Sequence, residues 1–206
     1  NDNRQRFNCL NFPLIQSHYR LNIYFHKLMN SPDHFRDGTR FSQVMAIYNN
    51  YSWLRNRLLT ILEPIEIKTR TQISHYLGIT YGSDAFYQKA ICKDEAIYQV
   101  ILDNFTNEIS RNSKDPVIKH HKTNYGGYFP IWVVIEFLSF NTLSKYYGNL
   151  QEKDKKTIAR NSYHVNDFFL GQWLHVLSVL RNICAHYGYL YRREYPLRPK
   201  MATEFG

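Results

Sequence analysis

Apolar residues recur at helical spacing along most of the chain, and this pattern constrains the fold more than any other feature. Between residues 41 and 62 the apolar side chains at this spacing are Val44, Ile47, Tyr48, Tyr51, Leu54, Leu58, Ile61 and Leu62. In a helix they form a stripe that packs against a core. No Asn-Gly or Asp-Gly turn lies between alternating apolar runs, since Asp37-Gly38 has polar flanks. The pattern therefore predicts an all-α helical bundle.

Prolines, glycines and capping residues divide this pattern. Pro64 either starts a second helix or kinks the first, and Gly78 is expected as the C-cap of a helix over residues 65–77. Ser83 or Asp84 is expected to cap a short helix after it.

The second half of the chain continues in the same way. Further helices are predicted over residues 94–109, 131–147, 151–160 and 166–187. Pro130 is expected at the first position of the second of these, Asn166 or Asp167 caps the last, and Gly188 ends it. Residues 110–127 are polar and basic and are predicted to form a loop.

The length of 206 residues predicts one domain. We expect a helical extension over residues 1–40, a helical core over residues 41–188, and a basic, aromatic tail over residues 189–206. The cysteines are odd in number and far apart (Cys9, Cys92, Cys184), which argues against a disulfide framework or a zinc site and indicates a reducing compartment. No metal or cofactor is expected.

The sequence predicts neither a membrane span nor a signal peptide. The best apolar run, residues 131–138, is interrupted by Glu136, whereas a membrane span needs about 20 apolar residues. The N-terminal residues are polar and no apolar stretch follows them. We therefore expect a cytoplasmic protein. Glu136, within a run predicted to be buried, is expected to have a partner such as an arginine or a tyrosine hydroxyl.

The charge balance points to polyanions as partners. The chain has 26 Lys and Arg against 17 Asp and Glu, a net charge of +9. Such a surface attracts phosphates. The 17 Tyr can stack on bases as well as fill a core. Binding to nucleic acid is expected, although many basic proteins bind nothing acidic.

On a helical wheel, residues 173–187 divide into two faces. The apolar face, expected to meet the core, holds Trp173, Val176, Leu177, Leu180, Ile183, Cys184 and Tyr187. The polar face holds His175, Ser178, Asn182, Ala185 and His186, with Arg181 on its flank. The small side chains Ser178 and Ala185 make the polar face a candidate interface with another helix.

Arg181 and His186 together suit phosphate chemistry. Arginine binds a phosphate through two nitrogens and stabilises developing charge, and histidine transfers protons near neutral pH. With RNA, the 2′-hydroxyl supplies the nucleophile and no metal is required. The same spacing occurs at Arg70 and His75, where an ion pair with Glu66, four residues before Arg70, is the simpler interpretation. Two occurrences barely exceed what composition predicts.

Three blocks of the sequence carry a more specific signal. Residues 177–186 resemble the L-x-x-L-R-N-x-C-A-H signature of the Abi-like (abortive infection) family of bacterial HEPN-domain proteins. Residues 130–144 are similar to the family's P-x-W-x-x-x-E-x-x-S-F-G-x-L-S block, and residues 65–73 to its I-E-x-x-x-R-T-x-I segment. The blocks keep the family's order.

This resemblance implies a HEPN-like bundle, a homodimer, and metal-independent RNA cleavage in antiviral or toxin biology. The family's R-x4-6-H motif maps onto Arg181 and His186 as catalytic residues, and the polar residue after the arginine maps onto Asn182. Half of a site lies on each chain, so two copies would complete it. An RNA or protein antitoxin is expected as a further partner.

Other residues are candidates for RNA contact. They are Arg70, His175, Tyr189, Tyr191, Arg192 and Arg193. The last four alternate aromatic and cationic side chains and would clamp a single strand, or else pack on the protein itself. His120 and His121 lack further ligands for a metal and are expected in a solvated or RNA-contacting loop.

Two other functions remain open at this stage. One is an RNA-binding module without turnover, held in a toxin–antitoxin or defence complex. The other is a structural scaffold in such a complex.

Overall fold

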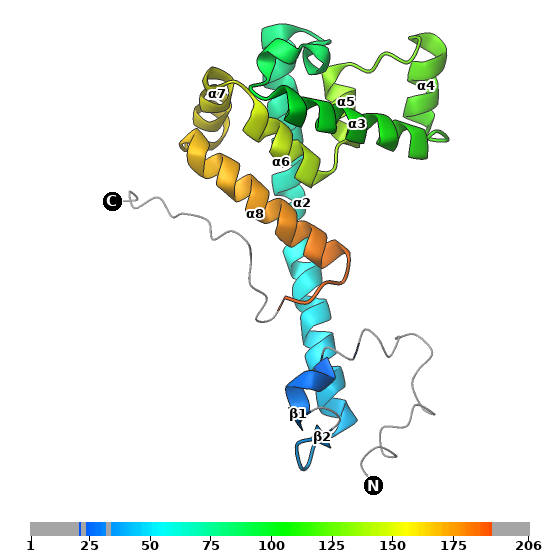
Figure 1. The fold of residues 1–206 in the computed structure, drawn as a ribbon, viewed down its shortest axis with the longest axis vertical. Helices are drawn as coiled ribbons and strands as arrows, with labels where there is room; N and C mark the ends of the chain where they lie inside the picture. Colours follow the sequence, from blue (N-terminus) through cyan, green and yellow to red (C-terminus); the bar gives the residue numbers. More distant parts are fainter. Residues whose placement is uncertain (1–20, 22–23, 32–33, 191–206) are drawn as a thin grey trace. The chain divides into compact units, whose positions relative to one another are not determined.

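The computed structural model describes residues 21, 24–31 and 34–190, and it confirms the mostly helical fold (Figure 1). The described part contains seven α-helices, α2 to α8, and a two-stranded antiparallel pair. It divides into two compact units. The first unit contains the described residues up to Thr60 and those from Ile183 onward, and the second unit runs from Ile61 to Asn182.

Helix α2 (Phe41–Tyr81) is one continuous helix that contributes residues to both units. Pro64 lies inside it and starts no new helix. Gly78 is also internal, so its predicted role as C-cap is wrong. A Cβ atom at Gly78 would lie 3.5 Å from the Ile131 side chain, which marks the place where α5 approaches α2. Of the predicted apolar stripe, Leu54 and Ile61 are exposed.

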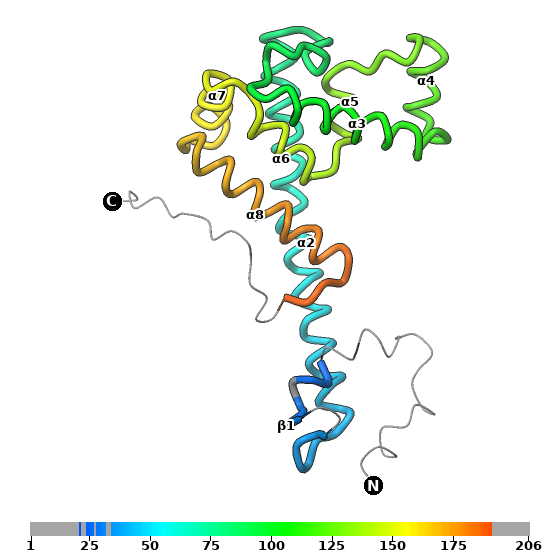
Figure 2. Tube along the Cα trace, in the orientation of Figure 1, coloured from blue at the N-terminus to red at the C-terminus, as the bar shows by residue number. Residues whose placement is uncertain are grey.

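Six further helices complete the second unit, and Figure 2 traces their succession. They are α3 (Glu95–Arg111), α4 (Pro116–Asn124), α5 (Ile131–Phe137), α6 (Phe140–Asn149), α7 (Glu152–Tyr163) and α8 (Asp167–Ala185), the last ending in the first unit. Two 3-10 turns, Ala85–Tyr87 and Lys89–Ile91, connect α2 to α3.

Local capping chemistry accounts for two differences from the predicted helices. Residues 110–127, predicted as a loop, contain α4, because the Asp115 side chain accepts hydrogen bonds from the backbone N–H groups of Val117 and Ile118. The predicted helix over residues 131–147 is two helices. Leu138 is extended, and the Ser139 side chain accepts from the Thr142 N–H to start α6. Pro130 is the N-cap of α5 rather than its first residue.

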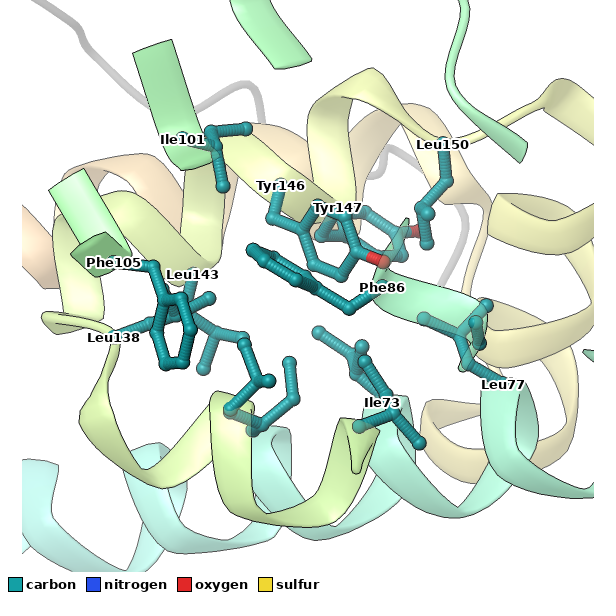
Figure 3. Packing of buried hydrophobic residues seen from close by; sticks show 14 of the residues in the cluster. Ile73, Leu77, Phe86, Ile101, Phe105, Leu138, Leu143, Tyr146, Tyr147 and Leu150 are labelled. Atoms are coloured by element: carbon teal, nitrogen blue, oxygen red, sulfur yellow. The ribbon is translucent and has the colours of Figure 1, made fainter. Parts of the chain in front are cut away.

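The core of the second unit is rich in aromatic side chains (Figure 3). Phe86 packs edge-on against Phe105 and Tyr146, with ring centroids 5.4 and 5.6 Å apart. Ile73 and Leu77 of α2 face the same cluster. The fully buried Asp154 of α7 accepts hydrogen bonds from two tyrosine hydroxyls of α2, at 2.8 Å from Tyr76 and 2.9 Å from Tyr81. These contacts fix α7 on α2.

The first unit has a small core of its own. Leu21, Tyr24, Phe25 and Val44 are buried there. Within residues 1–40, expected as a helical extension, the described part has helical residues at Leu21, Tyr24 and Phe25 and a 3-10 turn, His26–Leu28. A short antiparallel pair follows, β1 (Met29–Ser31) and β2 (His34–Phe35).

Candidate functional site

Arg181 is held by a carboxylate from a distant part of the sequence. Its Nε lies 3.3 Å from Glu66 Oε2, and its Nη1 donates to Asn182 Oδ1 at 3.5 Å. The Arg181 side chain is 37% exposed, whereas that of Glu66 is only 12% exposed. The guanidinium is therefore anchored on one edge and reaches solvent with the rest, a geometry suited to binding an anion.

Glu66 also binds a second arginine. Arg70 Nη2 lies 2.5 Å from Glu66 Oε1, which confirms the predicted ion pair one helical turn apart. The other Arg70 terminal nitrogen donates to the carbonyl oxygens of Ile135 and, at 3.3 Å, Glu136. These carbonyls end α5 and have no partner within that helix, so Arg70 caps α5. With 11% of its side chain exposed, Arg70 is mainly a structural cation.

These contacts join the three blocks singled out in the sequence. Glu66 and Arg70 belong to the first block, the α5 carbonyls to the second, and Arg181 to the third. A family model for Abi-like proteins matches residues 15–192. The chain belongs to the Abi-like protein family. Comparisons with curated proteins and with solved structures each give no match.

The Abi-like signature ends in a tight turn after α8. The Gly188 N–H donates to Ile183 O at 2.7 Å and the Tyr187 N–H to Cys184 O at 3.3 Å, the two bonds of a Schellman motif. Tyr187 takes the left-handed conformation with φ 58°. His186 is thus the C-cap of α8, and its side chain is exposed. Arg181 and Asn182 lie within the second unit, and His186 lies within the first.

The orientation of α8 differs from the helical-wheel prediction. Ser178, placed on the polar face, is completely buried, and Tyr187, placed on the apolar face, is 62% exposed. Leu170 and Leu174 pack in the core, and Ser178 continues their i, i+4 row. Its hydroxyl donates to the His175 carbonyl at 2.8 Å, so burial leaves it satisfied. Ser178 therefore offers no open interface.

The remaining predicted RNA contacts fall in several places. His175 is partly exposed on α8. Tyr189 packs in the first unit, with ring centroids 5.6 Å from Tyr24 and 5.8 Å from Tyr51. The other predicted contacts in the tail, Tyr191, Arg192 and Arg193, lie outside the described residues.

Glu136 does not have the predicted role. Its side chain is exposed, and its carbonyl oxygen is the group that Arg70 binds. The carboxylate that contacts Arg181 is that of Glu66. Of the two contacts that Glu66 makes, the ion pair with Arg70 could be predicted from the sequence, since Glu66 stands four residues before Arg70. Its second contact, with α8, depends on tertiary packing and has no local signature.

The described residues offer neither a metal site nor a membrane span. They contain no group of three or more His, Cys, Asp or Glu side chains that could hold a metal ion. None of their helices is long and apolar enough to cross a membrane.

Proposed function

We propose that this Abi-like protein is a metal-independent endoribonuclease of the HEPN type, with Arg181 and His186 as catalytic residues. Membership of the Abi-like family suggests a role in abortive-infection defence. The observation that carries the proposal is the anchored, partly exposed guanidinium of Arg181. In the sequence, His186 follows it by five residues, and His186 is itself exposed.

The roles follow from ordinary phosphoryl-transfer chemistry. Arg181 binds the scissile phosphate and stabilises the charge that develops on its oxygens. Glu66 positions Arg181 by holding Nε, while 37% of the arginine side chain stays exposed. Asn182 accepts a hydrogen bond from Nη1 at 3.5 Å and so helps to orient the same guanidinium. His186 transfers protons, because an imidazole accepts and releases protons near neutral pH.

The reaction needs no external nucleophile. The ribose 2′-oxygen loses its proton to one histidine and bonds to phosphorus, and the bond from phosphorus to the 5′-oxygen breaks. A second histidine protonates that leaving oxygen. The products are a 2′,3′-cyclic phosphate and a 5′-hydroxyl. Because the two proton transfers use two histidines, a homodimer that pairs His186 with His186 of the partner subunit completes the site.

The test compares wild type with the His186→Ala variant on labelled RNA in EDTA, with product ends mapped. We expect cleavage by wild type only, leaving cyclic-phosphate ends. His75→Ala is the matched control, because His75 is also exposed and follows an arginine by five residues. It should cleave like wild type. A strict requirement for Mg²⁺, or products ending in a 3′-hydroxyl, would refute the mechanism.

Arg181→Ala separates catalysis from binding. If the protein is a ribonuclease, this variant should lose RNA cleavage. It should keep most of its RNA affinity, because other cations still bind the RNA. If wild type and variants all bind RNA without cutting it, the protein is instead an RNA-binding module. Toxicity on expression, relieved by His186→Ala and by a cognate RNA or protein antitoxin, is the expected cellular counterpart.

A further inference from the structure

Helix α4 is a short, firmly held element that the proposed site does not use. It follows the C-terminal end of α3 (Figure 1). Asp115 accepts hydrogen bonds from Val117 N at 2.8 Å and Ile118 N at 3.3 Å. Ile118 is fully buried in the core of the second unit. The cap and this anchor fix which side of α4 faces solvent.

The solvent side of this region is strongly basic. Residues 111–125 contain four cations against one carboxylate, and all four are exposed: Arg111, Lys114, Lys119 and Lys122. The carboxylate, Asp115, is engaged as the helix cap. The positive charge is therefore not neutralised within residues 111–125.

An exposed aromatic ring lies at the end of the same helix. Tyr125 is 56% exposed. Its ring centroid lies 5.5 Å from that of His120 and 5.3 Å from that of His121. His121 in turn stacks on the buried Phe129 ring at 5.1 Å.

A hydrogen bond fixes the imidazole beneath this ring. His121 Nδ1 lies 2.9 Å from the Tyr128 carbonyl oxygen. Because a carbonyl only accepts, Nδ1 is the nitrogen that carries the proton. Phe129 and His121 thus hold the Tyr125 ring in place, and the ring is exposed to solvent.

We propose that α4 and the Tyr125 turn form a docking surface for single-stranded RNA, separate from the cleavage residues. Lys119 and Lys122 contact successive phosphates, and a base stacks on Tyr125. Exposed cations beside a supported aromatic ring are the combination that single-strand binders use. The inference rests on the proposed function, in which RNA is the substrate. It adds a second RNA-binding surface on the same chain.

The surface does not fit a membrane. An interfacial helix needs a broad apolar face opposite its cations. Among the described residues of α4, Val117 is the one large aliphatic side chain that is exposed, since Ile118 is buried. Stacking on Tyr125 also distinguishes RNA from a polyanion without bases.

The test measures binding of a fluorescent 2′-O-methyl RNA, which the proposed reaction cannot cleave, over a range of salt concentrations. Each phosphate contact on a single strand contributes about 0.7 to the slope of log affinity against log salt. Lys119→Ala combined with Lys122→Ala should reduce the slope by about 1.4. Lys145→Ala with Lys156→Ala removes two exposed lysines from α6 and α7 and is the matched control. It should leave the slope nearly unchanged.

Tyr125 variants test stacking separately from charge. Tyr125→Ala should weaken RNA binding roughly 10-fold and leave binding of inorganic polyphosphate unchanged, whereas Tyr125→Phe should bind RNA like wild type. Circular dichroism checks that each variant is folded.

Several results would overturn the inference. The first is an equal decrease of the salt slope in both double-lysine variants. The others are an unchanged RNA affinity of Tyr125→Ala, no RNA binding by wild type, or a preference of wild type for phosphatidylserine vesicles over RNA. Binding that depends on α4 without any cleavage by wild type would instead refute only the ribonuclease proposal.

Discussion

Glu66 binds two arginines whose surroundings differ, so their contributions to stability should differ in a known order. The Glu66–Arg70 pair is 2.5 Å long with both side chains almost buried, whereas Arg181, at 3.3 Å, is 37% exposed. A charged hydrogen bond shielded from water contributes about 1.5–3 kcal/mol, and solvent screening reduces a partly exposed pair to below about 1 kcal/mol. We expect the free energy that couples Glu66 to Arg70 to exceed the one that couples it to Arg181.

Double-mutant cycles with Glu66→Gln, Arg70→Met and Arg181→Met measure both energies. The assay is urea unfolding followed by circular dichroism, with the free energy of unfolding extrapolated to water. Arg160→Met, an exposed arginine of α7, is the control and should show no coupling to Glu66. Arg70→Met alone should cost more than Arg181→Met, because it also uncaps α5. Equal couplings, or a larger one for Arg181, would refute the assignment of Arg70 to the fold and of Arg181 to the substrate.

Three further predictions concern the fold. The buried Tyr146 hydroxyl has no hydrogen-bond partner in the described part of the chain, so Tyr146→Phe should raise the free energy of unfolding by about 1 kcal/mol. Tyr147→Phe removes a 3.1 Å hydrogen bond to a backbone carbonyl and should lower the free energy of unfolding by a similar amount. Gly188→Ala should destabilise the turn after α8, because the added Cβ would lie 2.9 Å from the Ile183 carbonyl oxygen; a thermal melt that matches wild type would contradict this. Burial raises the pKa of the Cys92 thiol from 9.0 to about 11. Its alkylation by iodoacetamide at pH 8 should therefore be about 100-fold slower than in the unfolded chain. The free energy of unfolding that comes from keeping this thiol protonated should be fully present below pH 9 and lost as the pH rises toward 11.

Features set by neighbouring residues could be predicted from the sequence. The helix predicted over residues 94–109 is present as α3, and Asp94 caps it, with its side chain accepting from Ile97 N at 3.0 Å. The Asn166 side chain accepts from Phe168 N at 2.9 Å at the start of α8. The Glu66–Arg70 pair lies one helical turn apart and is also local. In each case the two partners are at most four residues apart, so spacing and residue type suffice.

Features that depend on tertiary contacts could not be predicted in this way. The contact between Glu66 and Arg181 requires α2 and α8 to be packed together, which no local pattern encodes. Leu170 and Leu174 pack in the core and set the rotation of α8 that buries Ser178. The helical-wheel prediction considered only hydrophobicity and therefore placed Ser178 on the polar face. The break before α6 was visible in principle, since Ser139 is a strong capping residue, but the continuous apolar run obscured it.

The turn after α8 places a conformationally unfavourable residue directly beside the proposed catalytic histidine. A side chain in the left-handed conformation costs roughly 1 kcal/mol that glycine would not. The chain nevertheless carries Tyr187 there, and this residue is 62% exposed. Tyr187→Gly is therefore a substitution that removes this backbone cost and, with it, the exposed ring next to His186. Because the relief of backbone strain and the loss of the ring act together at one position, a thermal melt of Tyr187→Gly measures which of the two has the larger effect on the stability of this turn.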